Sequence, residues 1–525
     1  MKRPDPVRLE ICHHLLAAMC EEAGLLLQQS AVSPNIRERR DFSVAAFDRK
    51  GRLVAQAAHI PVHLGSAGDA IAAARSAIAF EPGDVAVLND PYEGGTHLPD
   101  VTMVVPVFAP GRREPDWFLS GRAHHADIGG ATPGSMGVAR DLYGEGLVIP
   151  PVLLRRRGEP QRDVLRMLLS NVRGSKERQL DFAAQESSLR RLSARLLALQ
   201  ADWGRGELMR YAEHLMDYAE REGRAALRQL ATGSFHACDA LEDDGMGNGP
   251  FAIDLRLTYS KGRLDFDFTR SGPMAVGGVN CNRSVVLAAC VYALRCLCPS
   301  RLPTNEGLFR LFTARTKLGT VVDPIKPAPV AGGNVETSQR LVDVCLAAIE
   351  KAMPGRIPAC SAGTMSNLSM GGTSAAGVGF AFYETLPGGA GAGPTRDARS
   401  ATQTHMTNTR NTPVEESELR YPVLVRALTV RRGSGGKGKR RGGDGIEKQV
   451  EALVPASVTF LGERHQSGPP GAAGGGSGAR GALSIVVGAG KGRPTRALPS
   501  KGTWALAAGD LVVVRTPGGG GHGRA

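Results

Sequence analysis

The N-terminal third of the chain alternates between helical and extended spacing of its hydrophobic residues. Over residues 7–30, apolar side chains recur every three or four positions, which predicts an amphipathic helix that ends near Pro34. Residues 41–55 instead hold two short apolar runs around a polar turn at 48–51, the pattern of a β-hairpin. Helical spacing returns over residues 66–80, so a second helix should follow the hairpin.

Three short apolar runs come next, and each predicts a buried strand. They cover residues 85–88, 101–108 and 117–120. The first run leads directly into Asn89 and Asp90, and the third leads towards His124. We therefore expect polar side chains where strands pass into loops, which is a rigid position for binding groups.

The rest of the chain divides into a helical, a mixed and a strand-rich part. The pattern predicts, in chain order, a charged helical arm over 160–233 that could contact another subunit, a hairpin over 251–269, buried helices over 280–298 and 332–352, a glycine-rich sheet over 364–382, and short strands from 423 onward. We predict a mixed α/β (α+β) fold with several lobes. Its four expected regions are an N-terminal α/β region 1–155, a helical arm 156–240, a central α/β region 241–420 and a β-rich, glycine-rich region 421–525.

Composition changes this picture in two places. Glycine makes up 67 of 525 residues without a collagen period, so many tight turns and close backbone approaches are expected. Residues 431–445 place lysines and arginines among glycines, which favours a mobile loop over a contact for an anionic substrate or a partner.

Charge and cysteine usage exclude several classes of protein. The net charge is +13, but the basic residues are spread along the chain with few aromatic neighbours, which argues against nucleic-acid binding. A high-GC coding bias towards Arg, Ala and Gly is the favoured explanation of this charge, and an acidic partner subunit is the alternative. The nine cysteines show no framework spacing, and the apolar runs are too short to span a bilayer. We expect a cytoplasmic protein without a membrane segment.

Two short blocks, 89–100 and 124–134, concentrate the polar chemistry on loops rich in glycine and proline. They contain three histidines and three aspartates, with His97-x-x-Asp100 followed by His124 or His125. Imidazole and carboxylate ligands without thiolates suit Zn, Mn or Fe. The competing interpretation is that these histidines are solvent-exposed or cap the loops. Upstream, Asp41, His59 and His63 are weaker candidates, because spacing alone supports them poorly.

Other motifs give no nucleotide site. The glycines at 332–333, before a predicted helix, indicate either an anion site or a helix cap formed by Asn334. The glycine run at 518–521 has no following helix, and no Walker sequence or Gly-x-Ser-x-Gly nucleophile motif occurs. We therefore expect no ATP to bind to this chain.

Several segments, in order, resemble the hydantoinase B/oxoprolinase family. They include Arg39-Arg40-Asp41-Phe42-Ser43, both polar blocks, Glu145-Gly146-Leu147-Val148-Ile149-Pro150-Pro151, Gly333-Asn334-Val335-Glu336-Thr337-Ser338-Gln339-Arg340, Thr407-Asn408-Thr409-Arg410-Asn411-Thr412-Pro413 and Thr516-Pro517-Gly518-Gly519-Gly520-Gly521. The resemblance covers nearly the whole chain and implies a hydantoinase B-like fold. It also implies a hetero-oligomer in which a separate A subunit, with an actin/hexokinase-like fold, binds ATP and Mg and phosphorylates the substrate or bicarbonate.

The resemblance also implies which residues form the site. Carried over motif by motif, the metal ligands are Asp41, His97, Asp100 and His124, with His125 as the rival to His124, and the metal is Zn or Mn acting as a Lewis acid. Our hypothesis is a B subunit that opens a small cyclic amide, of hydantoin or 5-oxoproline type. His59, His63 and His125 are the candidate general bases. The alternatives are a subunit of an ATP-dependent ketone carboxylase and a structural scaffold for the ATPase subunit.

Overall fold

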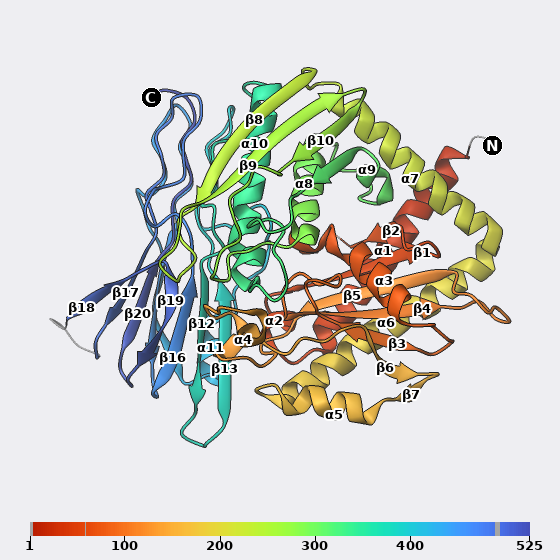
Figure 1. Cartoon of the computed structure of the whole chain (residues 1–525), viewed down its shortest axis with the longest axis horizontal. Helices are drawn as coiled ribbons and strands as arrows, with labels where there is room; N and C mark the ends of the chain where they lie inside the picture. Colours follow the sequence, from red (N-terminus) through yellow and green to blue (C-terminus); the bar gives the residue numbers. More distant parts are fainter. Residues whose placement is uncertain (1–3, 58, 489–493) are drawn as a thin grey trace.

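The first sheet of the molecule carries both polar blocks at its strand ends. In the computed structural model, which describes residues 4–57, 59–488 and 494–525, this sheet has the order β2-β1-β5-β4-β3-β6-β7 (Figure 1). The strands are β1 (Phe42–Asp48), β2 (Leu53–Gln56), β3 (Val85–Leu88), β4 (Asp100–Val107), β5 (Trp117–His124), β6 (Val152–Arg156) and β7 (Glu159–Pro160). All of its pairings are antiparallel.

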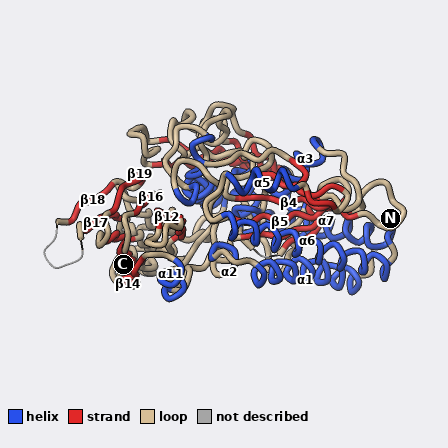
Figure 2. Tube along the Cα trace, turned by 90° about the horizontal axis from the view of Figure 1, so that it is seen from below, coloured by secondary structure: helices blue, strands red, loops and turns tan. Residues whose placement is uncertain are grey.

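Helices cover both faces of this sheet, which explains why every residue of β4 and β5 is buried. Successive side chains of a strand point to opposite faces. On one face, Val101 and Met103 join an apolar cluster with α1 and α6, and on the other, Val104 joins a cluster with α3. The helices of this part are α1 (Pro6–Ser30), α2 (Pro34–Arg37), α3 (Ser66–Ala77), α4 (Leu142–Glu145), α5 (Arg162–Ser170), α6 (Ser175–Trp203) and α7 (Arg205–Leu227). The predicted arm is therefore packed, with α1, α6 and α7 side by side (Figure 2).

The start of α1 shows how local sequence sets an element boundary. Asp5 is the N-cap, and its carboxylate accepts a hydrogen bond from the Val7 amide at 3.0 Å. Pro6 occupies the first helical position, where its missing N–H costs nothing. The buried face of the helix follows the predicted apolar spacing: Cys12, Leu16, Met19, Cys20, Ala23, Gly24 and Leu27.

The second sheet forms the central part of the molecule, with the order β11-β10-β9-β8. Its strands are β8 (Gly233–Leu241), β9 (Phe251–Ser260), β10 (Arg263–Asp267) and β11 (Phe312–Arg315). Helices α8 (Arg283–Leu297) and α10 (Ser338–Ala352) pack with it around the largest apolar cluster, and the short α9 (Glu306–Phe309) precedes β11. A π-helical turn, Gly333–Thr337, leads into α10.

Two further sheets pack around one apolar cluster at the C-terminal end of the molecule, on the left of Figure 1. One has the order β13-β12-β16-β19 and the other β14-β15-β20-β17-β18. Their elements are β12 (Asn367–Thr373), β13 (Gly379–Thr385), α11 (Val414–Arg420), β14 (Val423–Val430), β15 (Ile446–Ala452), β16 (Ala456–Leu461), β17 (Ala482–Val486), β18 (Thr495–Leu498), β19 (Lys501–Leu506) and β20 (Leu511–Arg515). Because β12 pairs with β16, one sheet contains strands from both of the regions predicted as 241–420 and 421–525. The four predicted region boundaries remain a prediction.

The prediction of a mobile loop over residues 431–445 is wrong. This segment belongs to a glycine lattice, which we define as residues 388–393, 434–443, 468–479 and 516–523, hydrogen-bonded backbone to backbone. Gly519 donates to the Gly443 carbonyl at 2.9 Å, and Gly436 donates to the Gly519 carbonyl at 2.8 Å. A Cβ atom on Gly519 would lie 1.9 Å from the carbonyl oxygen of Ala390, so only glycine permits this approach. These segments are rich in glycine because their backbones lie too close together to leave room for side chains.

The predicted mixed α/β fold with a β-rich C-terminal region is confirmed. The main differences lie at element ends, since the helix predicted over 66–80 ends at Ala77 and the helix predicted over 280–298 begins at Arg283. Among the described residues, none of the helices combines the length and hydrophobicity that crossing a bilayer requires.

Candidate metal centre

Strand pairing brings together residues that lie far apart in the chain. In the antiparallel pair of β4 and β5, Asp100 lies directly opposite His124. His97 belongs to the turn just before β4. Asp41 immediately precedes β1, which pairs with the other edge of β5, and its carbonyl accepts the His124 amide at 2.9 Å. The sheet therefore gathers all four predicted ligands at one end.

Three of these side chains form a tight, buried cluster. One carboxylate oxygen of Asp100, Oδ1, lies 3.3 Å from His97 Nε2 and 3.4 Å from His124 Nδ1. Two ligand atoms bound tetrahedrally to one Zn ion lie about 3.4 Å apart. One atom from each of the three residues falls within 4.8 Å of the others. The spacing thus fits a shared divalent ion.

Unpartnered nitrogen atoms support the same conclusion. Neither ring nitrogen of His97 has a hydrogen-bond partner among the described residues, nor does Nε2 of His124. Each buried polar group left without a partner costs about 1–3 kcal/mol. Burial lowers the pKa of His124, although Asp100 and Asp41 oppose this effect. The neutral imidazole that results is the form that binds metal.

The second oxygen of Asp100, Oδ2, is held by neighbouring donors. It accepts hydrogen bonds from Thr96 Oγ1 at 2.6 Å and from His63 Nε2 at 3.1 Å. His63 Nδ1 in turn lies 2.9 Å from Ser43 Oγ. Burial disfavours the charged carboxylate, yet His97 and His63 hold the pKa of Asp100 well below its usual range. Asp100 is thus ionised and oriented for an ion.

Asp41 lies at the same cavity but outside the tight cluster. Its carboxylate lies 3.5 Å from the Arg39 guanidinium. The cavity has a volume of about 20 Å³ and is lined by Asp41, His63, His97, Asp100 and His124. A space of this size holds one ion or one water molecule.

The structure separates two predicted residues from the cavity. His125 follows the last residue of β5 and points to the opposite face, with its ring 4.6 Å from that of Phe182 and its Nε2 3.3 Å from Gln185. His59 lines a different pocket, packs edge-on against Phe42, and accepts the Val44 amide at 3.2 Å. Neither side chain lines the metal cavity. The prediction that His59 or His125 acts as a general base at this site is therefore wrong. Of the three predicted bases, only His63 lines it.

Part of the cavity wall comes from residues that sequence analysis missed. The ring of Tyr383, on β13, stacks on His124 with centroids 4.8 Å apart, and its hydroxyl donates to Asn367 Oδ1 at 2.9 Å. Met365, Thr385, Met406 and Thr407 complete this wall with Asn334 and Val335. Thr407 and Asn334 lie in motifs noted above, whereas Tyr383 carries no local signal.

The predicted helix cap at Asn334 is wrong, because the π-helical turn and α10 show no side-chain cap hydrogen bond. Asn334 faces the cavity instead. Two residues on, the buried carboxyl of Glu336 accepts bonds from the Met365 amide and from Asn367 Nδ2. Burial raises the pKa of Glu336 to about 8. These contacts fix the turn against β12.

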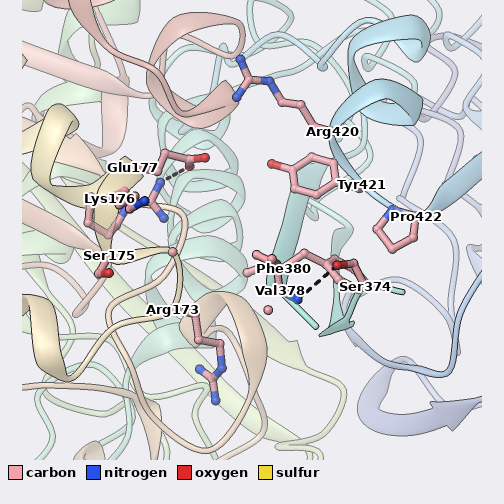
Figure 3. A pocket seen from close by; sticks show the side chains of 14 residues that line it. Arg173, Ser175, Lys176, Glu177, Ser374, Val378, Phe380, Arg420, Tyr421 and Pro422 are labelled. Atoms are coloured by element: carbon pink, nitrogen blue, oxygen red, sulfur yellow. Dashed lines mark hydrogen bonds and ion pairs between the residues drawn. The ribbon is translucent and has the colours of Figure 1, made fainter. Parts of the chain in front are cut away.

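A cavity of about 780 Å³ lies away from this chemistry. Figure 3 shows its labelled side chains coming from the start of α6 on one side and from β13 and the end of α11 on the other. Its arginines are paired already, Arg173 with Asp127 at 3.0 Å, Arg178 with Asp181 at 3.3 Å and Arg420 with Glu416. None of the predicted site residues lines it, so size alone does not locate the site here.

The chain is similar to known proteins over nearly its whole length. The family model described as hydantoinase B/oxoprolinase matches residues 5–525. The chain is 37% identical over 525 residues to an uncharacterised protein of Methanocaldococcus jannaschii, covering 99% of this chain and 91% of that protein. It is 36% identical over 545 residues to 5-oxoprolinase 1 of Arabidopsis thaliana, covering 99% of this chain but only 42% of that longer protein.

A solved structure shows the same fold. The ATP-dependent caprolactamase from Pseudomonas jessenii superposes with a TM-score of 0.92 and 27% identity, covering 100% of this chain and 92% of that one. The match of family model, sequence and fold over the whole length leads to one assignment. The chain belongs to the hydantoinase B/oxoprolinase family.

Proposed function

We propose that this chain is the metal-dependent B subunit of an ATP-dependent hydrolase that opens a small cyclic amide of hydantoin or 5-oxoproline type. The observation that carries the proposal is the buried His97, Asp100 and His124 cluster with its unpartnered nitrogens. The names of two similar proteins, a 5-oxoprolinase and an ATP-dependent caprolactamase, support a cyclic amide as the substrate class.

A separate ATPase subunit is part of this proposal. The sequence has no nucleotide-binding motif, and more than half of the Arabidopsis 5-oxoprolinase lies outside the part that this chain matches. We assign ATP and Mg to a hydantoinase A-like partner, which would phosphorylate the amide oxygen before the ring opens beside the metal cavity of this chain.

The residues that line the metal cavity would have different roles when the phosphorylated cyclic amide opens. His97, Asp100 and His124 would hold Zn or Mn, with Asp41 as a further ligand. When bound, the ion supplies Lewis-acid chemistry. His63 bonds to Asp100 and Ser43 through its two nitrogens, so we assign it the positioning of Asp100 rather than proton abstraction. Tyr383 and Met406 form part of the wall of this cavity.

ATP turnover by the reconstituted pair of subunits tests this proposal. The assay compares 5-oxoproline, hydantoin, ε-caprolactam and acetone, each with and without bicarbonate. We expect stimulation by a cyclic amide alone, and its loss in His97→Ala. His236→Ala is the matched control, because that histidine is exposed and pairs with Asp254 on the second sheet.

The other outcomes distinguish the alternatives. Stimulation only by the ketone with bicarbonate would replace the hydrolase by a carboxylase. Full activity of His97→Ala, together with no metal in the purified protein, would leave this chain as a scaffold for the ATPase subunit.

A further inference from the structure

A second cavity lies close to the metal cavity and has no assigned role. Its volume is about 400 Å³, within the range of small-molecule sites. It is lined by β8, by one face of α10, and by residues 357–360 and 470–472. Figure 1 shows α10 beside β8. The N-terminal approach to α10, at Asn334, reaches the metal cavity, so a single helix borders both spaces.

One short segment separates the two cavities. His405 lines the second cavity, while the next two residues, Met406 and Thr407, line the metal cavity. The segment is fixed on both sides, since Gln339 donates to the Thr404 carbonyl at 3.1 Å and the Val62 amide donates to Met406 at 3.2 Å. The backbone of His405 is left-handed, with φ 57°. The fold thus holds this side chain in the cavity at the cost of backbone strain.

The cavity combines apolar walls with charged residues, Asp239, Glu350 and Lys351, and with a polar edge formed by Asp343 and His405. Val344, Leu346 and Ile357 supply much of the apolar wall. At the edge, Asp343 Oδ1 and His405 Nε2 lie 3.7 Å apart, which is too far for a hydrogen bond between them. Among the described residues, none donates a hydrogen bond to Asp343 Oδ1. The edge is therefore open to a ligand.

Neighbouring groups set the charges of this edge. The other oxygen of Asp343 lies 3.3 Å from the Arg464 guanidinium. Burial lowers the pKa of His405, although Asp343 opposes it, so the imidazole is neutral. The Tyr292 hydroxyl lies 3.4 Å from His405 Nδ1. When that hydroxyl donates to Nδ1, the ring proton is on Nε2, and the edge presents one acceptor and one donor side by side.

We propose that this cavity binds a small cyclic amide, whose N–H donates to Asp343 while its carbonyl accepts from His405. In a small ring the amide is cis, so its nitrogen and oxygen share one edge, about 2.3 Å apart by standard bond lengths. Two hydrogen bonds that diverge slightly from this edge span the 3.7 Å between the protein atoms. The methylenes of the ring lie against Val344 and Leu346. The choice of ligand class rests on the proposed function.

Two other roles fit this cavity less well. Burial raises the pKa of the Cys360 thiol to about 12, so this lining cysteine is not a nucleophile at neutral pH. A free carboxylate or phosphate ligand would face the unpaired oxygen of Asp343. The cavity is therefore a holding site for a neutral ring, one chain segment away from the metal cavity.

Calorimetric titration of the full chain, loaded with Zn, tests the proposal. The probes are 2-pyrrolidone and N-methyl-2-pyrrolidone, which lacks the N–H donor. Ala347→Trp fills the cavity from an exposed lining position. His405→Asn tolerates the left-handed backbone and shortens the donor. Ala201→Trp, at an exposed position of α6, is the matched control.

We expect 2-pyrrolidone to bind at least tenfold more tightly than its N-methyl form. Both Ala347→Trp and His405→Asn should weaken its binding at least tenfold, and Ala201→Trp should leave it unchanged. Equal binding by Ala347→Trp and the wild type would overturn the proposal, as would no binding by the wild type.

A parallel assay separates this proposal from the proposed function. If 2-pyrrolidone binding fails one of these tests but cyclic amides still stimulate ATP turnover by the reconstituted pair, only the second site is refuted. If turnover does not respond to cyclic amides either, both conclusions fail.

Discussion

Replacing His97 by alanine should affect stability very differently with and without metal. In the metal-free chain, both ring nitrogens of His97 are buried and make no hydrogen bond with any described residue, at about 1–3 kcal/mol for each group. Removing the ring relieves this cost, but truncating a large buried side chain costs about 2–5 kcal/mol. The two effects nearly cancel, so the metal-free variant should lie within about 2 kcal/mol of the wild type.

Metal changes this balance. At a concentration of one hundred times the Kd, an ion that binds only the folded chain stabilises it by about 2.7 kcal/mol. The wild type should gain this increment, and its melting temperature should rise with the concentration of Zn or Mn. His97→Ala leaves two of the three clustered ligands, so its melting temperature should hardly respond. Differential scanning fluorimetry over a metal titration measures both chains.

His125→Ala is the control, because that ring packs on Phe182 outside the cavity. It should lower stability by a constant amount and keep the full metal response. The reasoning would be refuted if His97→Ala were equally destabilised with and without metal and kept the wild-type response. Loss of the response in His125→Ala alone would reverse the assignment of His124 as the ligand.

Three further predictions test other parts of the structure. Gly519→Ala places a Cβ atom 1.9 Å from a backbone oxygen, so it should lower the free energy of unfolding by about 3 kcal/mol or more in chemical denaturation. The control, Gly68→Ala, lies in open space on α3 and should be neutral or slightly stabilising. Equal effects of the two substitutions would contradict the packing argument. Burial lowers the pKa of His465 to about 4 from 6.5, so the unfolded chain binds its proton first and stability should fall as the pH drops from 6.5 to 4, by up to about 3 kcal/mol. His465→Phe should flatten this part of the melting profile, and an unchanged slope would count against it. Tyr383→Phe removes the hydrogen bond to Asn367 but keeps the ring stacked on His124. We expect kcat to fall by about fivefold, the equivalent of about 1 kcal/mol, while the metal affinity stays constant. A weaker metal affinity in a titration would contradict this expectation.

The sequence was informative where the chemistry is local. His97 and Asp100 are three residues apart, and the apolar runs on either side predicted the strands that hold them. The choice between His124 and His125 could not be made in the same way. Two neighbouring residues at a strand end point to opposite faces, and which face holds the cavity depends on α6 and Phe182.

Long-range packing explains what remained hidden. Tyr383 reaches His124 across more than 250 residues of sequence, and only the pairing and position of β13 bring them together. The wall formed by Met406 likewise depends on a segment fixed by Val62. Neither contact leaves a periodic or compositional trace in the sequence.

The glycine lattice has a consequence for how the molecule responds to temperature. Backbone hydrogen bonds at distances such as 2.8 and 2.9 Å hold it together, and its segments carry few apolar side chains. Apolar surface dominates the heat capacity of unfolding, and its contribution to stability weakens on cooling. The lattice should therefore lose less stability in the cold than the sandwich of sheets beside it. Slow amide hydrogen exchange that persists near 0 °C would be the signature of this difference.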